Sequence, residues 1–486
     1  MRRMTERTFS LLAVTTVFLL TVSGTARAQA AFTVTAHSGS LADGAEYLIE
    51  VPSDWNGTLF LYSHGYVVPG SANPARDVGD PFTRFFMLSH HFALAGSSYA
   101  TTGWAIHEAL RDQIAVLDIF KLVVGSPKRT IAWGHSLGGI ITAGLIQRHP
   151  RRFDAALPMC GVLSGGVATW NTALDSAFAF KTLLAPGTGL EVVNIANPLA
   201  NLDLAEVVLA EAQGTPQGRA RIALAGALAD LPGWFTPLSS EPAPTDFAGQ
   251  EMNQFLWDQQ VDFPFGFAFR AELEARAQGN VSWNTGVDYR RQLDRSIGRD
   301  QVIALYQQAG LDLDSDLKTL NDAARISADP EAVRYLERNI IFDGEIHIPV
   351  LTLHTKGDGL VVVQNESAYK DVVDEAGNGE FLRRTFVDRA GHCSFTPAET
   401  IAAVQTLVKR LDTGGWQGVD ASDLNNAAAA LGPGFNIFGT PQGIVQVPPA
   451  YIEFDPSQYL RPFDALTGEC KFGFLCGDPF VQVDLR

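Results

Sequence analysis

Apolar and polar positions along the chain predict strands that alternate with helices. Residues 32–37 and 46–51 alternate as the two strands of a hairpin do, and residues 58–62 and 129–133 are short continuous apolar runs, typical of strands buried on both faces. Further strands are expected near residues 92–101, 153–159, 348–353 and 381–387, with helices over 108–123, 137–148 and 397–411. This spacing predicts crossover connections and therefore a mostly parallel sheet flanked by helices, the α/β class.

The alternation stops between residues 161 and 345. That segment is rich in Ala and Leu, has helical stretches, and carries an aromatic cluster at 263–269 that suits either a helical core or a substrate-facing wall. We expect a large, mainly helical cap at 161–345, inserted between a first core segment at 31–160 and a second at 346–412. Residues 413–486 are rich in Gly, Pro and aromatics, and we expect an irregular C-terminal extension.

The first thirty residues have the three-part layout of a secretory signal peptide. Three arginines precede a mostly apolar run at residues 9–20, and an Ala-x-Ala pattern follows as a cleavage site. The run is short of the ~20 apolar residues that span a bilayer, so a transmembrane anchor is the weaker interpretation. We expect a secreted protein, extracellular or periplasmic, without a stable membrane anchor.

Composition and charge exclude other classes. Hydrophobic residues make up 46% of the chain and charged residues 18%, which is enough to bury a core and too apolar for a disordered chain. The formal net charge is −17 and no run of Lys and Arg occurs, so a nucleic-acid partner is not expected.

Gly134-His135-Ser136-Leu137-Gly138 fits the Gly-x-Ser-x-Gly pattern of a nucleophile elbow. The pentapeptide alone is a weak signal, but here it follows a predicted buried strand and precedes a predicted helix. That arrangement places a serine hydroxyl on a tight turn at the carboxyl end of a sheet, next to the free N–H groups of a helix start. Ser136 is therefore the candidate nucleophile.

A serine nucleophile needs a base and an acid that orients the base, and both occur after predicted strands. Asp358 follows the strand near residue 354, and His392 follows the strand near residue 387. The order Ser, acid, His is the one this elbow requires. Asp388 is the rival acid, but it lies only four positions before His392 and belongs to the same strand end. We expect a Ser136–Asp358–His392 triad.

The oxyanion hole requires two backbone donors beside the nucleophile. The N–H of Leu137, directly after Ser136, is one candidate. The other is the N–H of Tyr66, because Gly65 lets the backbone after the strand at residues 58–62 pass close by. Trp104, on the loop after the neighbouring strand, is a candidate substrate contact.

The four cysteines are an even number, and in an exported protein two disulfides are the default. Cys470 and Cys476 are six positions apart in a turn-like stretch and are expected to pair, which leaves Cys160 with Cys393. No His lies at ligand spacing from either pair, and we expect neither a metal nor a cofactor.

With these motifs together, the chain resembles members of the α/β-hydrolase superfamily of the secreted serine esterase and lipase type. The resemblance implies an eight-stranded, mostly parallel sheet, a Ser136–Asp358–His392 triad, and a lid inserted after the sixth strand, where residues 161–345 fall. Fungal tannases and feruloyl esterases also carry a Cys directly after the catalytic His, like Cys393. In that family it is bridged to a Cys before the Ser, a position that His135 occupies here.

The expected activity is hydrolysis of a carboxylic ester, small or polymeric, through an acyl-enzyme on Ser136. An exported aminopeptidase or amidase on the same scaffold is the alternative, and it needs a site for a substrate amine. Asp262 and Glu272 are the candidates for that site. A catalytically silent binding protein on a hydrolase scaffold is the alternative from another class.

Overall fold

The computed structural model describes residues 33–463, and their main sheet has nine strands in the order β1-β2-β4-β3-β5-β6-β7-β8-β11. Strands β4, β3, β5, β6, β7 and β8 run parallel, while β1, β2 and β11 are antiparallel to their neighbours. The predicted α/β class is confirmed. The strands are β1 (Val34–Ser40), β2 (Glu46–Pro52), β3 (Thr58–Ser63), β4 (Ala93–Ser97), β5 (Arg129–His135), β6 (Ala155–Met159), β7 (Val350–Gly357), β8 (Leu382–Ala390) and β11 (Tyr451–Ile452).

The expected count of eight strands is one too few, because the C-terminal segment adds β11 to the edge of the sheet. Tyr451 pairs with Val387 and Ile452 with Phe386, both on β8. A two-residue strand has no alternation to detect in the sequence. It nonetheless covers part of the backbone that an edge strand leaves unpaired.

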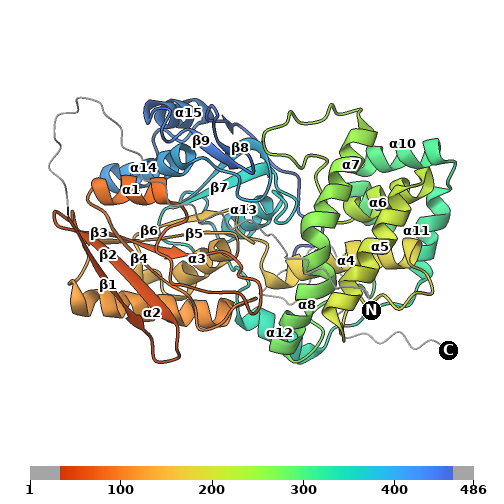
Figure 1. Cartoon of the computed structure of the whole chain (residues 1–486), viewed down its shortest axis with the longest axis horizontal. Coiled ribbons are helices and arrows are strands. Elements are labelled where there is room, and N and C mark those ends of the chain that lie inside the picture. Colours follow the sequence, from red (N-terminus) through yellow and green to blue (C-terminus); the bar gives the residue numbers. More distant parts are fainter. Residues whose placement is uncertain (1–32, 464–486) are drawn as a thin grey trace, which may run out of the picture.

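Helices cover both faces of the sheet, as a parallel sheet requires (Figure 1). One face carries α1 (Pro81–Ser89), α14 (Pro397–Thr413) and α15 (Ala421–Ala430), and the other carries α2 (Ile106–Val123), α3 (Leu137–Arg148) and α13 (Asn365–Glu375). The central strand β3 is buried at all six positions, which explains its continuous apolar run. The start of α14 is fixed by a capping box between Thr396 and Glu399.

The residues between β6 and β7 form a group of helices beside the sheet, the helical lobe (Figure 1). Its members are α4 (Gly166–Leu184), α5 (Pro198–Gln213), α6 (Pro216–Ala227), α7 (Phe247–Trp257), α8 (Arg270–Ala277), α9 (Tyr289–Arg295), α10 (Arg299–Ala309), α11 (Leu313–Asp322) and α12 (Pro330–Arg338). Two π-helical segments, Asp258–Asp262 and Phe265–Phe269, join α7 to α8. The lobe has an apolar cluster of its own, to which Phe263 and Phe267 both belong.

The segment after β11 runs from the sheet into the lobe. Arg461 is 1% exposed, and its guanidinium lies 2.9 Å from the carboxylate of Asp175 on α4. Tyr459 and Phe463 are buried in the apolar cluster that the lobe shares with the sheet. Part of the expected irregular extension therefore packs inside the molecule, after a short hairpin formed by β9 (Ile437–Thr440) and β10 (Gly443–Gln446).

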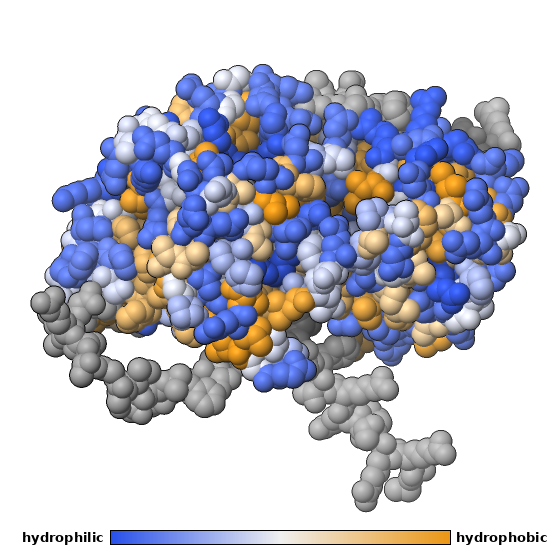
Figure 2. Space-filling model, turned by 90° about the horizontal axis from the view of Figure 1, so that it is seen from above, coloured by the Kyte–Doolittle hydropathy of each residue, from blue (hydrophilic) through white to orange (hydrophobic). Residues whose placement is uncertain are grey.

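On the face seen in Figure 2, hydrophilic residues predominate and hydrophobic ones form separate small groups. None of the helices between residues 33 and 463 is long and apolar enough to cross a membrane. The predicted signal peptide at residues 1–30 and the predicted Cys470–Cys476 pair lie outside the described residues.

Candidate active site

Ser136 lies on a tight turn between β5 and α3, with φ 59° and ψ −123°. This left-handed conformation is strained for a residue with a side chain, and it is typical of the nucleophile elbow. A Cβ at Gly138 would lie 1.9 Å from the carbonyl oxygen of Ser63, and one at Gly134 would lie 2.4 Å from the same atom. Both glycines are therefore required where β3 passes under the turn.

The structure brings His392 and Asp358 to Ser136. The Nε2 atom of His392 lies 2.7 Å from Ser136 Oγ, and its Nδ1 atom lies 2.8 Å from Asp358 Oδ2. The Asp358 side chain is 0% exposed and that of His392 is 20% exposed. The rival Asp388 is 44% exposed and lies 3.5 Å from Lys356 Nζ, so it takes no part in this contact.

Asp358 is held from behind by a network that the sequence did not reveal. The backbone N–H of Val361 donates to Asp358 Oδ1 at 3.0 Å, and His354 Nε2 lies 3.6 Å from Asp358 Oδ2. The Nδ1 atom of His354 lies 3.1 Å from Glu366 Oε1, and the hydroxyl of Thr352 donates to Glu366 Oε2 at 2.6 Å. Strand β7 is buried on both faces, so no alternation marks which of its polar residues point toward the site.

The predicted Cys160–Cys393 disulfide is present, with its two Cα atoms 5.4 Å apart across a sequence separation of 233. Cys160 directly follows β6, whose last residue, Met159, accepts a hydrogen bond from the N–H of Ser136. The disulfide therefore ties the loop that carries His392 to the strand end beside the serine.

The turn after β3 lies against Ser136. A Cβ at Gly65 would lie 3.4 Å from Ser136 Cβ and 3.8 Å from its Oγ, so the backbone of this turn passes close to the serine. Tyr66 and Leu137 lie beside Ser136 in one cavity wall. The ring of Tyr66 packs against Phe265 of the lobe, with the ring centroids 5.0 Å apart.

His135, directly before the serine, is not oriented as a base. Its Nδ1 atom lies 3.1 Å from the hydroxyl of Tyr62. Burial, together with repulsion by His392, lowers the pKa of His135 to about 4. His135 therefore stays neutral and packs beneath the elbow, where tannases and feruloyl esterases have a cysteine.

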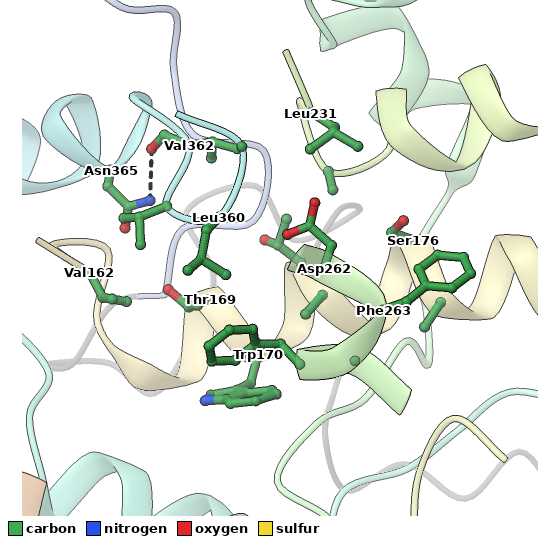
Figure 3. Close-up of a pocket in the computed structure, with 18 of the residues that line it drawn as sticks. Val162, Thr169, Trp170, Ser176, Leu231, Asp262, Phe263, Leu360, Val362 and Asn365 are labelled. Carbon is green, nitrogen blue, oxygen red and sulfur yellow. Dashed lines mark hydrogen bonds between the residues drawn. The ribbon is translucent and has the colours of Figure 1, made fainter. Parts of the chain in front are cut away.

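A cavity of about 140 Å³ lies against Ser136, between the sheet and the helical lobe. Figure 3 shows its residues converging from α4, the segment before α8 and the loop between β7 and α13. Trp104, predicted as a substrate contact, is part of the wall. None of the described residues that line the cavity is a Lys, Arg or His. Its aromatic members are Tyr66, Trp104, Trp170, Phe263, Phe265, Phe267 and Tyr459.

Two carboxyl groups of the lobe, Asp258 and Asp262, also line this cavity. In Figure 3 the Asp262 side chain points into the space between Leu231 and Leu360, and its Oδ2 atom has no hydrogen-bond partner. Burial, with repulsion by Asp258 and Asp358, raises the pKa of Asp262 well above its usual range, and burial likewise raises that of Asp258. Both acids are therefore harder to ionise than an exposed Asp.

Glu272, the other candidate for binding a substrate amine, has partners within the protein. Its carboxylate lies 2.6 Å from the guanidinium of Arg276 and accepts a hydrogen bond from the N–H of Trp104. It is not among the cavity-lining residues. Within residues 33–463, no group of three His, Cys, Asp or Glu side chains is placed to hold a metal ion.

Comparison with known proteins gives evidence of the family to which the chain belongs. The model of the prolyl oligopeptidase family matches residues 101–184, which include the elbow. An o-phthalyl amidase of Xanthobacter agilis is 31% identical over 427 residues, which cover 82% of this chain and 91% of that protein.

The solved structures that match this chain are distant from it in sequence. An esterase from Aspergillus oryzae is 13% identical, with a TM-score of 0.44 and coverage of 88% of each chain. Feruloyl esterase B from Aspergillus oryzae is 11% identical, with a TM-score of 0.37 and coverage of 80% of this chain and 82% of that one.

The sheet order, the crossover helices and the family match define a serine hydrolase of the α/β-hydrolase superfamily. Within that superfamily, the extent and identity of the match show that the chain belongs to the family of the o-phthalyl amidase from Xanthobacter agilis.

Proposed function

We propose that this protein hydrolyses an amide of an aromatic carboxylic acid through an acyl-enzyme on Ser136. The observation that carries the proposal is the cavity, because a space lined by aromatic side chains begins at the hydroxyl that His392 and Asp358 activate. The related amidase supports an amide as the bond that is cleaved.

The proposed reaction follows the order of contacts around Ser136. His392 takes the Ser136 proton at Nε2 while Oγ attacks the carbonyl carbon, and Asp358 holds the ring by its Nδ1–H. The N–H groups of Tyr66 and Leu137 are the donors for the oxyanion. His392 then passes the proton to the leaving amine nitrogen, and water releases the acid from the acyl-enzyme in the reverse sequence.

The size and polarity of the cavity favour a single aromatic ring as the acyl group. Its volume of about 140 Å³ is close to the roughly 150 Å³ of an engineered apolar cavity that binds benzene. The raised pKa values of Asp258 and Asp262 argue against an aminopeptidase, because burial disfavours the charged carboxylate that would attract a substrate ammonium group. Both can still form hydrogen bonds with a polar substituent on the ring.

We further propose that the helical lobe acts as the cap of the active site and that the protein is exported. The lobe supplies Trp170, Phe263 and Phe267 to the cavity wall, so it encloses one side of the acyl group. The Cys160–Cys393 disulfide favours an oxidising compartment. Cell fractionation, with the N-terminus of the exported form sequenced, tests the second proposal.

The test compares benzoyl p-nitroanilide with p-nitrophenyl benzoate, acetate and palmitate on the purified protein and its Ser136→Ala variant. We expect turnover of both benzoyl compounds, loss of both in the variant, and poor turnover of the palmitate because a long acyl chain exceeds the cavity. A fluorophosphonate probe should label the parent protein at Ser136. Absence of labelling would indicate the silent binding protein, and undiminished turnover by the variant would exclude Ser136 as the nucleophile.

Ester hydrolysis is the second candidate function, because the same acyl-enzyme cycle cleaves esters and an alcohol is a better leaving group than an amine. Turnover of p-nitrophenyl benzoate without any turnover of the matched anilide would establish an esterase. An amidase should cleave both.

A further inference from the structure

His354 is fully buried behind the triad, and both of its ring nitrogens face oxygen acceptors. Nδ1 lies 3.1 Å from Glu366 Oε1, and Nε2 lies 2.8 Å from the carbonyl oxygen of Val361. Nε2 also lies 3.6 Å from Asp358 Oδ2, the oxygen that contacts His392. The side chains of His354, Asp358 and Glu366 are each 0% exposed.

Two arrangements of protons satisfy these contacts. In one, His354 is an imidazolium that donates from both nitrogens, and Glu366 is a carboxylate that accepts from His354 and from Thr352. In the other, His354 is neutral and a protonated Glu366 donates to its Nδ1. A neutral imidazole with an ionised Glu366 is excluded, because a ring lone pair would then face an oxygen lone pair.

The position of Asp358 favours the imidazolium. Burial by itself lowers the pKa of His354, but the hydrogen bond to Glu366 and the negative charges of Glu366 and Asp358 outweigh it and bring the pKa above its usual value. The other ionisable groups around Asp358 are His392, which it contacts, and Asp262 across the cavity, whose pKa is raised by burial. His354 is therefore the cation that this buried cluster provides for two carboxylates.

We propose that His354 is a buried imidazolium, held by Glu366, and that it acts as a positioning residue that keeps Asp358 ionised and aimed at His392. His354 touches no reacting atom. The Val361 N–H and His354 constrain the two oxygens of Asp358 from the side opposite His392. Its positive charge offsets part of the negative charge that Asp358 presents to His392.

The protonation state can be measured without turnover, by NMR of the full-length protein labelled with ¹⁵N-histidine. The His354 signals are assigned by their loss in His354→Gln. We expect both ring nitrogens to remain protonated between about pH 6 and 8, a range in which an unperturbed histidine with a pKa near 6.5 loses its proton. In Glu366→Gln, the ring should become neutral within that range. A neutral, singly protonated His354 in the parent protein at pH 7 would overturn the proposal.

The positioning role is tested by the pH dependence of kcat/KM, and this part rests on the proposed function. In His354→Gln, the acid limb should move to higher pH by about one unit, because an uncompensated Asp358 favours protonated His392. The double variant His354→Gln/Glu366→Gln also removes the Glu366 carboxylate that the single variant leaves without its partner, and it should show the same displaced limb. A purely structural role predicts that the double variant regains the parent profile.

His347→Gln is the control, since this side chain is 59% exposed and its replacement should leave the limb in place. An imidazolium by NMR with an unchanged acid limb in both His354 variants would overturn the positioning role. If no substrate is turned over, the proposed function fails, while the NMR result still decides whether the imidazolium exists.

Discussion

Carboxyl groups on the two sides of the cavity differ in their hydrogen-bond partners. Behind the wall formed by the loops after β5 and β7, Asp358 and Glu366 have a hydrogen-bond partner for each oxygen. On the wall formed by the helical lobe, Asp262 has an oxygen without a partner, and no ionic partner lies among the cavity residues. The Asp262 Oδ2 atom is buried, as Asp358 and Glu366 are, so the difference lies in the hydrogen-bond partners.

This difference indicates separate roles for the two walls, one in the chemical step and the other in recognition of the substrate. A buried carboxylate is stable only where donors and a cation surround it, and the sheet provides these through adjacent strand ends. The lobe provides apolar contacts and raises the pKa values of its acids. Under the proposed function, the wall on the sheet stabilises charge during the reaction, and the wall on the lobe fits an uncharged ring.

The largest expected effect concerns the acid of the triad. Asp358→Asn should lower kcat by about 10⁴-fold, because the amide holds His392 in the wrong tautomer. Asp388→Asn is the matched control: this residue is exposed on the same strand end as His392, and its replacement should leave kcat within twofold, roughly the scatter of a surface change. Equal losses in the two variants would contradict the assignment of Asp358.

The next effect concerns the disulfide that ties the His392 loop to β6. Cys160→Ala/Cys393→Ala should lower the free energy of unfolding by about 2–5 kcal/mol, because the crosslink closes a long loop of the unfolded chain. It should also lower kcat, since Cys393 directly follows His392. Urea denaturation of the double variant, with kcat measured well below the midpoint, checks both. Unchanged stability and kcat would mean that the loop is positioned without the crosslink.

On the lobe wall, a smaller effect follows from the raised pKa values of Asp258 and Asp262. The folded protein keeps the protons of these two acids at pH values above about 3.9, the pKa at which the unfolded chain releases them. The free energy of unfolding therefore falls as pH rises from about 3.9 toward the raised pKa values of the folded protein. Each unit by which a pKa is raised in the folded protein lowers the free energy of unfolding by about 1.4 kcal/mol once the pH is above the raised pKa.

Asp258→Asn/Asp262→Asn should therefore gain stability relative to the parent between pH 4 and neutrality. Urea unfolding at a series of pH values measures the difference in free energy of unfolding between parent and variant. Contributions from the protein's other buried acids are common to both proteins and cancel in this difference. A parent and variant whose stabilities stay parallel over the whole range would show that the two carboxyls ionise normally.

The smallest effect concerns recognition by Asp262. Asp262→Leu should alter KM for benzoyl substrates with a polar ring substituent by about tenfold or less, as one hydrogen bond is worth about 0.5–1.5 kcal/mol, and should leave kcat nearly constant. Asp262→Asn retains a hydrogen-bonding amide and should stay close to the parent. If Asp262→Leu lost as much kcat as Asp358→Asn, Asp262 would take part in the chemical step, and the distinction between the two walls would be wrong.

Local patterns predicted much of the fold. The helix over residues 137–148 and the buried runs at β3 and β5 occur where hydrophobic periodicity places them, because parallel strands and their covering helices need those periods. The short strand β11 and the burial of Arg461 had no local signal. Each depends on a partner distant in sequence, Val387 for Tyr451 and Asp175 for Arg461.

The sequence by itself determined the elbow around Ser136, the order of the triad and the pairing expected for Cys160 and Cys393, because each follows from turn chemistry, strand ends or cysteine arithmetic. Only the tertiary structure decided which polar residues have partners. His354 and Glu366 are brought together behind Asp358, and Asp262 is turned into an apolar cavity. The charge of a buried group depends on what surrounds it in space, and that neighbourhood comes from segments far apart along the chain.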